Sequence, residues 1–203
     1  SKYLIALDRS GPINYGEMLT EAREEIDKGG SLETIVMLGE QIENSVSWET
    51  MLDDGDAVNA KKMEHRTSQV NVEDRMMLAY TSGTTGHPKG VTHSHKPVRN
   101  TYERAMLLGH NRNDVHLSYL PLFHAYGFSE VAMMVALTGA SQVLFDVFDP
   151  DEVLDAVESE QGTVLHGFDS HWADLIRAQT ERARDVSSLR VGTLPAGMES
   201  TIP

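Results

Sequence analysis

The residues best suited to chemistry stand together in one short stretch, where the chain reads YTSGTTGHPKG from Tyr80 to Gly90. Glycines let the backbone approach an anion closely and turn its N–H groups toward it. Hydroxyl side chains add donors, and the lysine adds a mobile positive charge. Such donors suit phosphate oxygens. The candidate phosphate-binding residues are Thr81, Ser82, Gly83, Thr84, Thr85, Gly86 and Lys89.

The order of these residues excludes the two commonest nucleotide-binding loops. A P-loop requires G-x-x-x-x-G-K-[ST], but Pro88 stands five positions after Gly83, and Gly90 follows Lys89. The stretch does not read G-x-G-x-x-G either. Composition alone favours an ordinary solvated loop, because clusters of Gly, Ser and Thr are common in turns. A more specific interpretation therefore depends on residue order.

Histidines are the other candidates for chemistry. His124 follows an apolar stretch in YLPLFHAYGF, a position at which a histidine taken alone is more often structural than catalytic. His93 and His95 stand two residues apart, without cysteine or a well-placed carboxylate beside them. Two imidazoles in that arrangement make a weak zinc site. The sequence therefore predicts no metal site.

The composition limits the partners and the compartment. The 203 residues include 17 Lys and Arg against 31 Asp and Glu, a net charge of −14, which argues against nucleic acid or an anionic membrane as partner. The lack of cysteine excludes disulfides and thiolate metal sites. No apolar run approaches the ~20 residues of a membrane span, and the first residues do not read as a secretory signal. We expect a cytoplasmic protein without an integral membrane segment.

The elements that must position these residues alternate between short apolar runs and segments of helical period, a pattern typical of strands joined by helical crossovers. The expected strands are Tyr3–Leu7, Thr34–Leu38, Met76–Tyr80, Val115–Leu120, Gln142–Phe145, Thr163–Leu165 and Leu189–Leu194. The expected helices are Gly16–Lys28, Val98–Leu108, Ser129–Leu137, Asp151–Glu160 and Ser170–Arg184. The sequence thus predicts an α/β fold with a largely parallel sheet flanked by helices.

The stretch YTSGTTGHPKG resembles the phosphate-binding signature of the AMP-forming adenylating enzymes, which include acyl-CoA synthetases, luciferases and the adenylation domains of peptide synthetases. The match is unbroken except at His87, a position that varies in the family. Further resemblances follow in the family's order: GVTHSHKPV, then YLPLFHAYGF, then GASQVLFDVFDPDEVLDAVESEQGTVLHG, then SSLRVGTLPAG. They extend from about Leu78 to Gly197 and are most similar to fatty acyl-CoA synthetases, in the central part of the N-terminal domain.

The resemblance implies a two-step reaction. A carboxylate attacks the α-phosphate of ATP, pyrophosphate leaves, and the acyl-adenylate passes to a thiol, usually that of coenzyme A. It implies ATP with Mg²⁺ as cofactors, CoA as co-substrate and a carboxylic acid, most simply a fatty acid, as substrate. Residues from Thr81 to Gly86 and Lys89 would hold the β- and γ-phosphates, and His124 would lie near the α-phosphate. The residues expected to border the acyl pocket are Tyr126, Gly127, Phe128 and Gly167.

The resemblance also sets the expected organisation. We expect an N-terminal α/β part over residues 1–75, in which 41–74 form a polar, partly disordered excursion over the surface. The AMP-binding core would then cover 76–203, with the phosphate loop at 80–90. The family's Tyr-Gly-x-Thr-Glu motif, whose Glu binds Mg²⁺, and its C-terminal lysine are not in this sequence. We therefore expect a fragment that is inactive alone and prone to self-association.

Two alternatives stay open. One is a relative with another substrate or acceptor, such as an aryl-CoA ligase or a peptide-synthetase adenylation domain. The other is a non-catalytic, degenerate nucleotide-binding or interaction domain of the same fold. The stretches GFDSHW and LPAGMES depart from the family's usual residues on the substrate side, so the acyl specificity is open as well.

Overall fold

A parallel three-stranded sheet organises the first of two compact units in the computed structural model, which describes residues 2–81 and 87–195. The first unit covers Ser1–Val70 and the second Asn71–Pro203. In the first, β4 (Thr34–Leu38) lies between β1 (Tyr3–Leu7) and β5 (Val46–Ser47). The core of this sheet is the β4 triplet Ile35, Val36 and Met37, which are at most 2% exposed. The predicted first two strands are confirmed at both ends.

The helical segment of the first unit is broken where the sequence predicted one helix over Gly16–Lys28. A short hairpin of β2 (Arg9–Ser10) and β3 (Ile13–Asn14) leads into α1 (Tyr15–Glu21), and α2 (Arg23–Gly29) follows. Ala22 separates the two helices, and the Thr20 hydroxyl donates to the carbonyl of Gly16 at 2.8 Å. Such bonding back to the preceding turn bends helices. The spacing of apolar residues in the sequence does not indicate such a break between two helices.

The segment 41–74, expected as a polar excursion over the surface, contains regular elements that the sequence did not predict. This segment holds β5, α3 (Trp48–Asp56) and α4 (Ala60–Ser68). Ser47 accepts from the N–H of Thr50 and Asn59 from that of Lys61, so both helices begin at side-chain caps. Neither helix has a buried residue, so no apolar stripe in the sequence indicates them.

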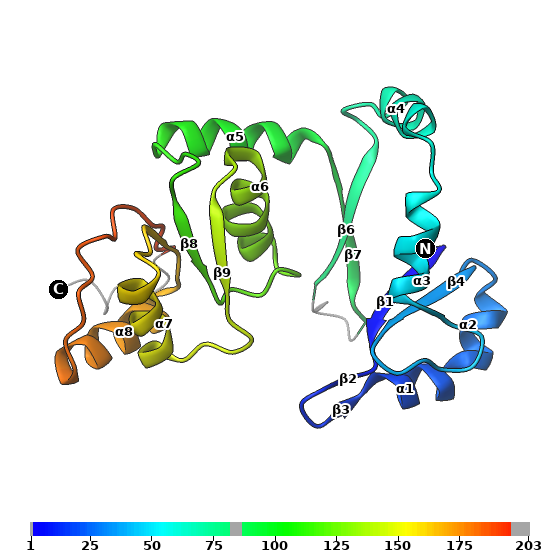
Figure 1. Cartoon of the computed structure of the whole chain (residues 1–203), viewed down its shortest axis with the longest axis horizontal. Helices are drawn as coiled ribbons and strands as arrows, with labels where there is room; N and C mark the ends of the chain where they lie inside the picture. Colours follow the sequence, from blue (N-terminus) through cyan, green and yellow to red (C-terminus); the bar gives the residue numbers. More distant parts are fainter. Residues whose placement is uncertain (1, 82–86, 196–203) are drawn as a thin grey trace. The chain divides into compact units, whose positions relative to one another are not determined.

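A second parallel sheet organises the second unit. The central strand β8 (Val115–Ser118) lies between β9 (Ser141–Leu144) and β10 (Val164–Leu165), and β8 and β9 run side by side in Figure 1. The predicted last strand, Leu189–Leu194, is reduced to a bridge between Val164 and Val191. Its backbone still pairs with the sheet, since Leu165 N donates to Val191 O at 3.2 Å and Gly167 N to Thr193 O at 3.2 Å.

Helices α7 (Pro150–Ser159) and α8 (Asp169–Glu181) cover this sheet and are adjacent in Figure 1. Asp149 caps α7 by accepting from the N–H groups of Asp151 and Glu152, and Pro150 occupies the first turn of the helix that was predicted over Asp151–Glu160. The main core cluster lies between these helices and the sheet. Its buried members are Leu117, Tyr119, Leu120, Val131, Val153, Leu154, Val157, Leu165, Leu175 and Ala178.

The remaining helices of the second unit pack against one another, and the π-helix among them also contacts the central strand β8. They are α5 (Lys96–Leu107), the π-helix η1 (Gly127–Met133) and α6 (Met134–Thr138). The predicted helix over Ser129–Leu137 is thus present but begins earlier and is wound as a π-helix first, a form often found at functional sites. No helix in the part of the chain that the structure describes is long and apolar enough to cross a membrane. The α/β fold with parallel sheets flanked by helices is confirmed.

An ion pair fixes the start of β8 to the segment after α8. Asp114 Oδ1 accepts from Arg190 Nε at 2.8 Å and from Thr163 Oγ1 at 2.8 Å, while Oδ2 accepts from the N–H of Asn111 at 2.8 Å. Burial raises the pKa of this carboxyl, but the bonds from Arg190, Asn111 and Thr163 outweigh burial and lower the pKa to about 2. Asp114 is therefore an ionised structural anchor at neutral pH.

Candidate functional site

An antiparallel hairpin presents the candidate phosphate-binding residues. It consists of β6 (Arg75–Thr81) and β7 (Lys89–Ser94), and its last pair is Thr81 with Lys89. The sequence predicted no strand between the Gly/Thr loop and the helix Val98–Leu108, whereas β7 lies between the loop and α5. The missed signal is the alternation of Val91 and His93 with smaller polar residues, the period of a strand.

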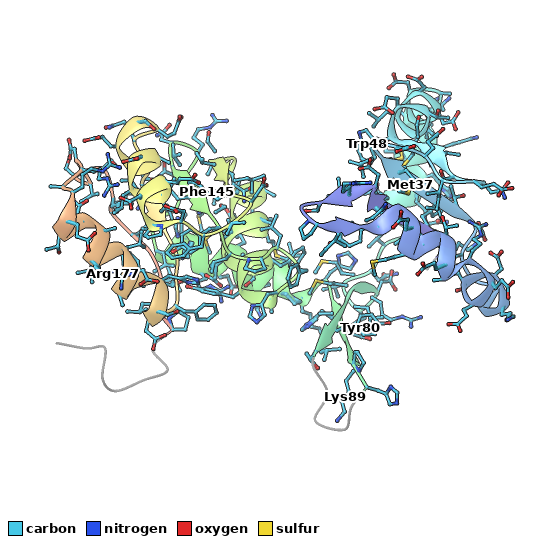
Figure 2. All side chains as sticks on the ribbon, turned by 90° about the horizontal axis from the view of Figure 1, so that it is seen from below. Met37, Trp48, Tyr80, Lys89, Phe145 and Arg177 are labelled. Atoms are coloured by element: carbon cyan, nitrogen blue, oxygen red, sulfur yellow. The ribbon has the colours of Figure 1, made fainter. Side chains whose placement is uncertain are left out.

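Two of the candidate phosphate ligands lie at the same end of this hairpin. Thr81 and Lys89 are both exposed, and the Thr81 hydroxyl donates to the Lys89 carbonyl at 3.5 Å. Figure 2 shows the side chains of Tyr80 and Lys89 on the two strands. The other five candidates, Ser82, Gly83, Thr84, Thr85 and Gly86, lie outside the described residues. The hairpin thus brings a hydroxyl and an ammonium to the two ends of the predicted loop.

His124 stands in a tight turn between β8 and η1. Its N–H donates to the carbonyl of Pro121 at 3.0 Å, and its carbonyl accepts from the N–H of Phe128 at 2.9 Å. Its Nδ1 accepts from the N–H of Tyr126 at 3.2 Å. An Nδ1 that accepts carries no proton, so the neutral ring carries its proton on Nε2. The turn therefore presents an exposed imidazole with a defined donor atom.

Gly127 makes this turn possible. A Cβ built on Gly127 would lie 2.3 Å from the carbonyl oxygen of Pro121 and 2.9 Å from that of Leu120. These are backbone atoms of the segment that leads to His124, so they cannot move aside without moving the turn. Any larger residue at 127 is therefore expected to displace the imidazole.

A small aromatic cavity adjoins the imidazole. The cavity has a volume of about 180 Å³ and is lined by Leu120, Pro121, Phe123, His124, Tyr126, Gly127 and Phe168. The structure thus brings the predicted catalytic histidine together with two predicted pocket residues, Tyr126 and Gly127. Phe128 instead lines a separate cavity of about 230 Å³ with Met77, His93 and Arg104. Gly167 lines neither cavity, and its missing Cβ faces the Tyr119 hydroxyl at 2.7 Å.

Two residues around the cavity were not indicated by the sequence. Phe168 lines it directly, and its only signal was its place after Gly167 in GFDSHW. Thr193 holds the cavity wall, because the Tyr126 hydroxyl donates to its carbonyl at 2.8 Å. Burial raises the pKa of Tyr126, which therefore acts as a neutral donor. No local pattern marks Thr193, since it acts across 67 residues of sequence.

A charge pair stiffens the π-helix behind the turn. Glu130 has a side chain only 9% exposed, and it accepts from Arg104 Nε of α5 at 3.0 Å. A buried carboxylate is costly without a partner, so Arg104 compensates its burial. This pair connects η1 to α5 next to the cavity that contains Phe128.

Comparisons with known proteins report on the family and the fold of this chain. The acyl-CoA ligase sidI of Aspergillus fumigatus is 28% identical over 170 residues, which cover 81% of this chain and 28% of that protein. The anthranilate CoA ligase AuaEII in complex with anthranoyl-AMP superposes with a TM-score of 0.72 at 24% identity, covering 96% of this chain and 36% of that one. ATP-bound MatB from Rhodopseudomonas palustris superposes with a TM-score of 0.69 at 22% identity, covering 95% of this chain and 35% of that one.

These comparisons differ in what they show. The two solved structures show the fold alone at such identities, and the chain spans about three tenths of the length of the curated relatives it matches. The family model described as AMP-binding enzyme matches residues 7–201. Because that match covers nearly the whole sequence, the chain belongs to the AMP-binding enzyme family.

Proposed function

We propose that this chain supplies the phosphate-holding hairpin and the carboxylate-activating turn of an ATP-dependent acid–CoA ligase. In the first step a carboxylate oxygen bonds to the α-phosphorus of ATP, and the bond from that phosphorus to its leaving oxygen breaks to release pyrophosphate. In the second step the CoA sulfur bonds to the acyl carbon, AMP leaves, and the thiol proton passes to solvent. The observation that carries the proposal is the exposed His124 imidazole beside an aromatic cavity.

The residues of this chain would act chiefly by electrostatics. Attack of an anion on a polyanion is slow mainly because of charge, and preorganised donors lower that barrier. Lys89 and Thr81 would hold the β- and γ-phosphates, with further hydroxyl and N–H donors from Ser82, Gly83, Thr84, Thr85 and Gly86. His124 would donate from Nε2 to an oxygen of the α-phosphate or of the attacking carboxylate.

ATP and Mg²⁺ fit the proposed residues differently. The donors at Thr81, Lys89 and His124 are hydroxyl, ammonium and imidazole, which suit phosphate oxygens. Mg²⁺ prefers carboxylate, phosphate and water oxygens, and none of these three side chains supplies one. When bound, Mg²⁺ would neutralise phosphate charge, with its oxygen ligands supplied by the phosphates and water rather than by these three side chains.

Two classes of carboxylic acid are candidates for the acyl substrate. The resemblance to fatty acyl-CoA synthetases favours a fatty acid. The cavity beside His124 favours an aryl acid, because Phe123, Tyr126 and Phe168 line it with rings and its volume of about 180 Å³ is small for a long chain. We place the reaction in the cytoplasm and expect the chain alone not to complete it, since it spans only part of its relatives.

ATP–pyrophosphate exchange tests this proposal. In a full-length protein that carries this sequence, Lys89→Ala should slow exchange by about 10²-fold, the size of effect seen when one transition-state donor is removed. Lys62→Ala, on the exposed face of α4, is the matched control and should leave exchange unchanged. Exchange measured with octanoate and with benzoate distinguishes the two substrate classes. Equal exchange in Lys89→Ala and Lys62→Ala would reject the phosphate-holding role.

A further inference from the structure

Three buried histidines meet at the start of the second sheet, away from the proposed adenylation residues. His110 follows α5, His116 lies on the central strand β8, and His166 follows β10. Their exposed fractions are 2%, 0% and 1%. The ring centroids are 5.2 Å apart for His110 and His116, and 5.9 Å apart for His116 and His166. Far apart in sequence, these imidazoles share one interior site.

Most of the imidazole nitrogens in this cluster lack hydrogen bonds. Both nitrogens of His110, both of His116 and Nε2 of His166 have no partner among the described residues. A buried polar atom left unpaired costs about 1–3 kcal/mol, so folded proteins hold few of them. A neutral imidazole carries one N–H and one lone pair, so His110 and His116 each hold a buried lone pair that a bound cation would satisfy.

A carboxylate completes the donor set. His110, Asp114 and His116 each offer one ligand atom, and these atoms all lie within 4.8 Å of one another. His110 Nδ1 is 3.7 Å from Asp114 Oδ2. Asp114 is also held by Asn111, Thr163 and Arg190, as carboxylates that bind metals usually are. Two imidazoles and one carboxylate suit zinc-like transition metals better than Mg²⁺ or Ca²⁺.

We propose that His110, Asp114 and His116 bind one divalent transition-metal ion of the zinc class. Zinc bonds to nitrogen and oxygen are about 2.0–2.2 Å long and tetrahedral, so two ligand atoms lie about 3.3–3.6 Å apart. The side chains must therefore close from separations of up to 4.8 Å to form the site. The fourth position is left to water. The site shares no residue with the proposed adenylation site.

Arg190 and His166 act as neighbours of this site rather than as ligands. Arg190 is paired with Asp114, but its side chain is 36% exposed, so it can turn toward solvent and open a path when a cation takes the carboxylate. His166 Nδ1 accepts from the N–H of Thr193 at 3.1 Å, which leaves the proton of the neutral ring on Nε2. A protonated nitrogen does not ligate. Metal and Arg190 therefore compete for Asp114.

Calorimetric titration of the metal-free 203-residue chain with ZnCl₂, and cobalt absorption after loading with CoCl₂, test the proposal. We expect one equivalent to bind and to raise the thermal midpoint. His116→Leu keeps the strand apolar and should weaken binding by at least about tenfold, as should Asp114→Asn if the leucine variant fails to fold. Arg190→Gln should tighten binding, because it removes the internal competitor.

Controls separate this site from adventitious binding. The double variant His93→Gln with His95→Gln removes the histidine pair on and just after β7 and should bind as the wild type does. Nitrogen NMR of the wild-type imidazoles should show zinc-dependent shifts at His110 and His116. No binding by the folded chain, binding lost only in the His93/His95 variant, or unchanged binding in folded His116→Leu or Asp114→Asn would each overturn the proposal.

Discussion

Gly127→Ala is the substitution that tests the geometry of the histidine turn most sharply. The added methyl would stand 2.3 Å from the Pro121 carbonyl oxygen, whereas ordinary contacts begin near 3.4 Å, so the turn must shift by about 1 Å. Overpacking of this kind costs about 1–3 kcal/mol. Alanine also lowers the conformational entropy of the unfolded chain, which stabilises the folded state by about 0.4–1 kcal/mol. We expect a net loss between about 0 and 2.6 kcal/mol, centred near about 1.3 kcal/mol.

The same shift should reach the chemistry, because the Pro121 carbonyl accepts the N–H of His124. A reacting group displaced by about 1 Å can cost about 10²-fold in rate. ATP–pyrophosphate exchange in a full-length protein that carries this sequence measures that effect, and urea unfolding of the 203-residue chain measures stability. Exchange should fall even at temperatures where the variant is fully folded.

Gly55→Ala supplies the matched control. Gly55 lies in α3, and a Cβ built there meets nothing within 4 Å, so alanine should be neutral or stabilising by about 0.4–1 kcal/mol. If Gly127→Ala unfolds at the same urea concentration as the wild type and exchanges at the same rate, the close approach to Pro121 does not constrain the turn. The assignment of Gly127 would then be wrong.

Three further outcomes follow from side-chain contacts. Arg104→Met leaves the buried Glu130 carboxylate unpaired and should lower the unfolding free energy by about 1–3 kcal/mol, whereas the double variant with Glu130→Gln should recover most of it; urea unfolding of the four proteins gives the coupling, and an additive result would contradict the pairing. Tyr126→Phe removes the bond to the Thr193 carbonyl and should cost about 0.5–1.5 kcal/mol, with no loss indicating that the cavity wall is held otherwise. Burial lowers the pKa of His171 below 6.5 in the folded protein, so the stability contributed by the neutral imidazole is full above about pH 6.5 and is lost as the pH falls toward the lowered pKa. His171→Gln can still accept the N–H of Phe168, so it should flatten the fall of unfolding free energy with decreasing pH; identical pH slopes in the two proteins would refute this.

The sequence predicted those parts of the molecule that depend on local pattern. Apolar runs such as Tyr3–Leu7 and Thr34–Leu38 are strands at the predicted bounds, because a short apolar run between turn residues is a local signal of a strand. The helix predicted over Asp151–Glu160 is present as α7, since the Asp149 cap and the first-turn Pro150 that start it act within three residues. The helices α3 and α4 were not predicted, because neither buries a residue and a capping residue without an apolar stripe is a weak signal.

The candidate site was predictable where several of its residues belong to one short sequence motif. His124, Tyr126 and Gly127 were identified together and line one cavity, because a single turn positions all three. Phe168 joins them only through the pairing of β10 with β8, which no local pattern reports. The cluster of His110, His116 and His166 was invisible for the same reason, since 50 residues separate the last two along the chain.

The central claim is that Lys89 and His124 act on one adenylation transition state. A double-mutant cycle of Lys89→Ala and His124→Ala, read by ATP–pyrophosphate exchange in a full-length protein carrying this sequence, tests it most directly. Each single variant should lose about 10²-fold or more, and the double variant should lose less than the product of the two, because groups that act as a unit are not additive. Wild-type exchange in either single variant, with both proteins folded, would contradict the claim.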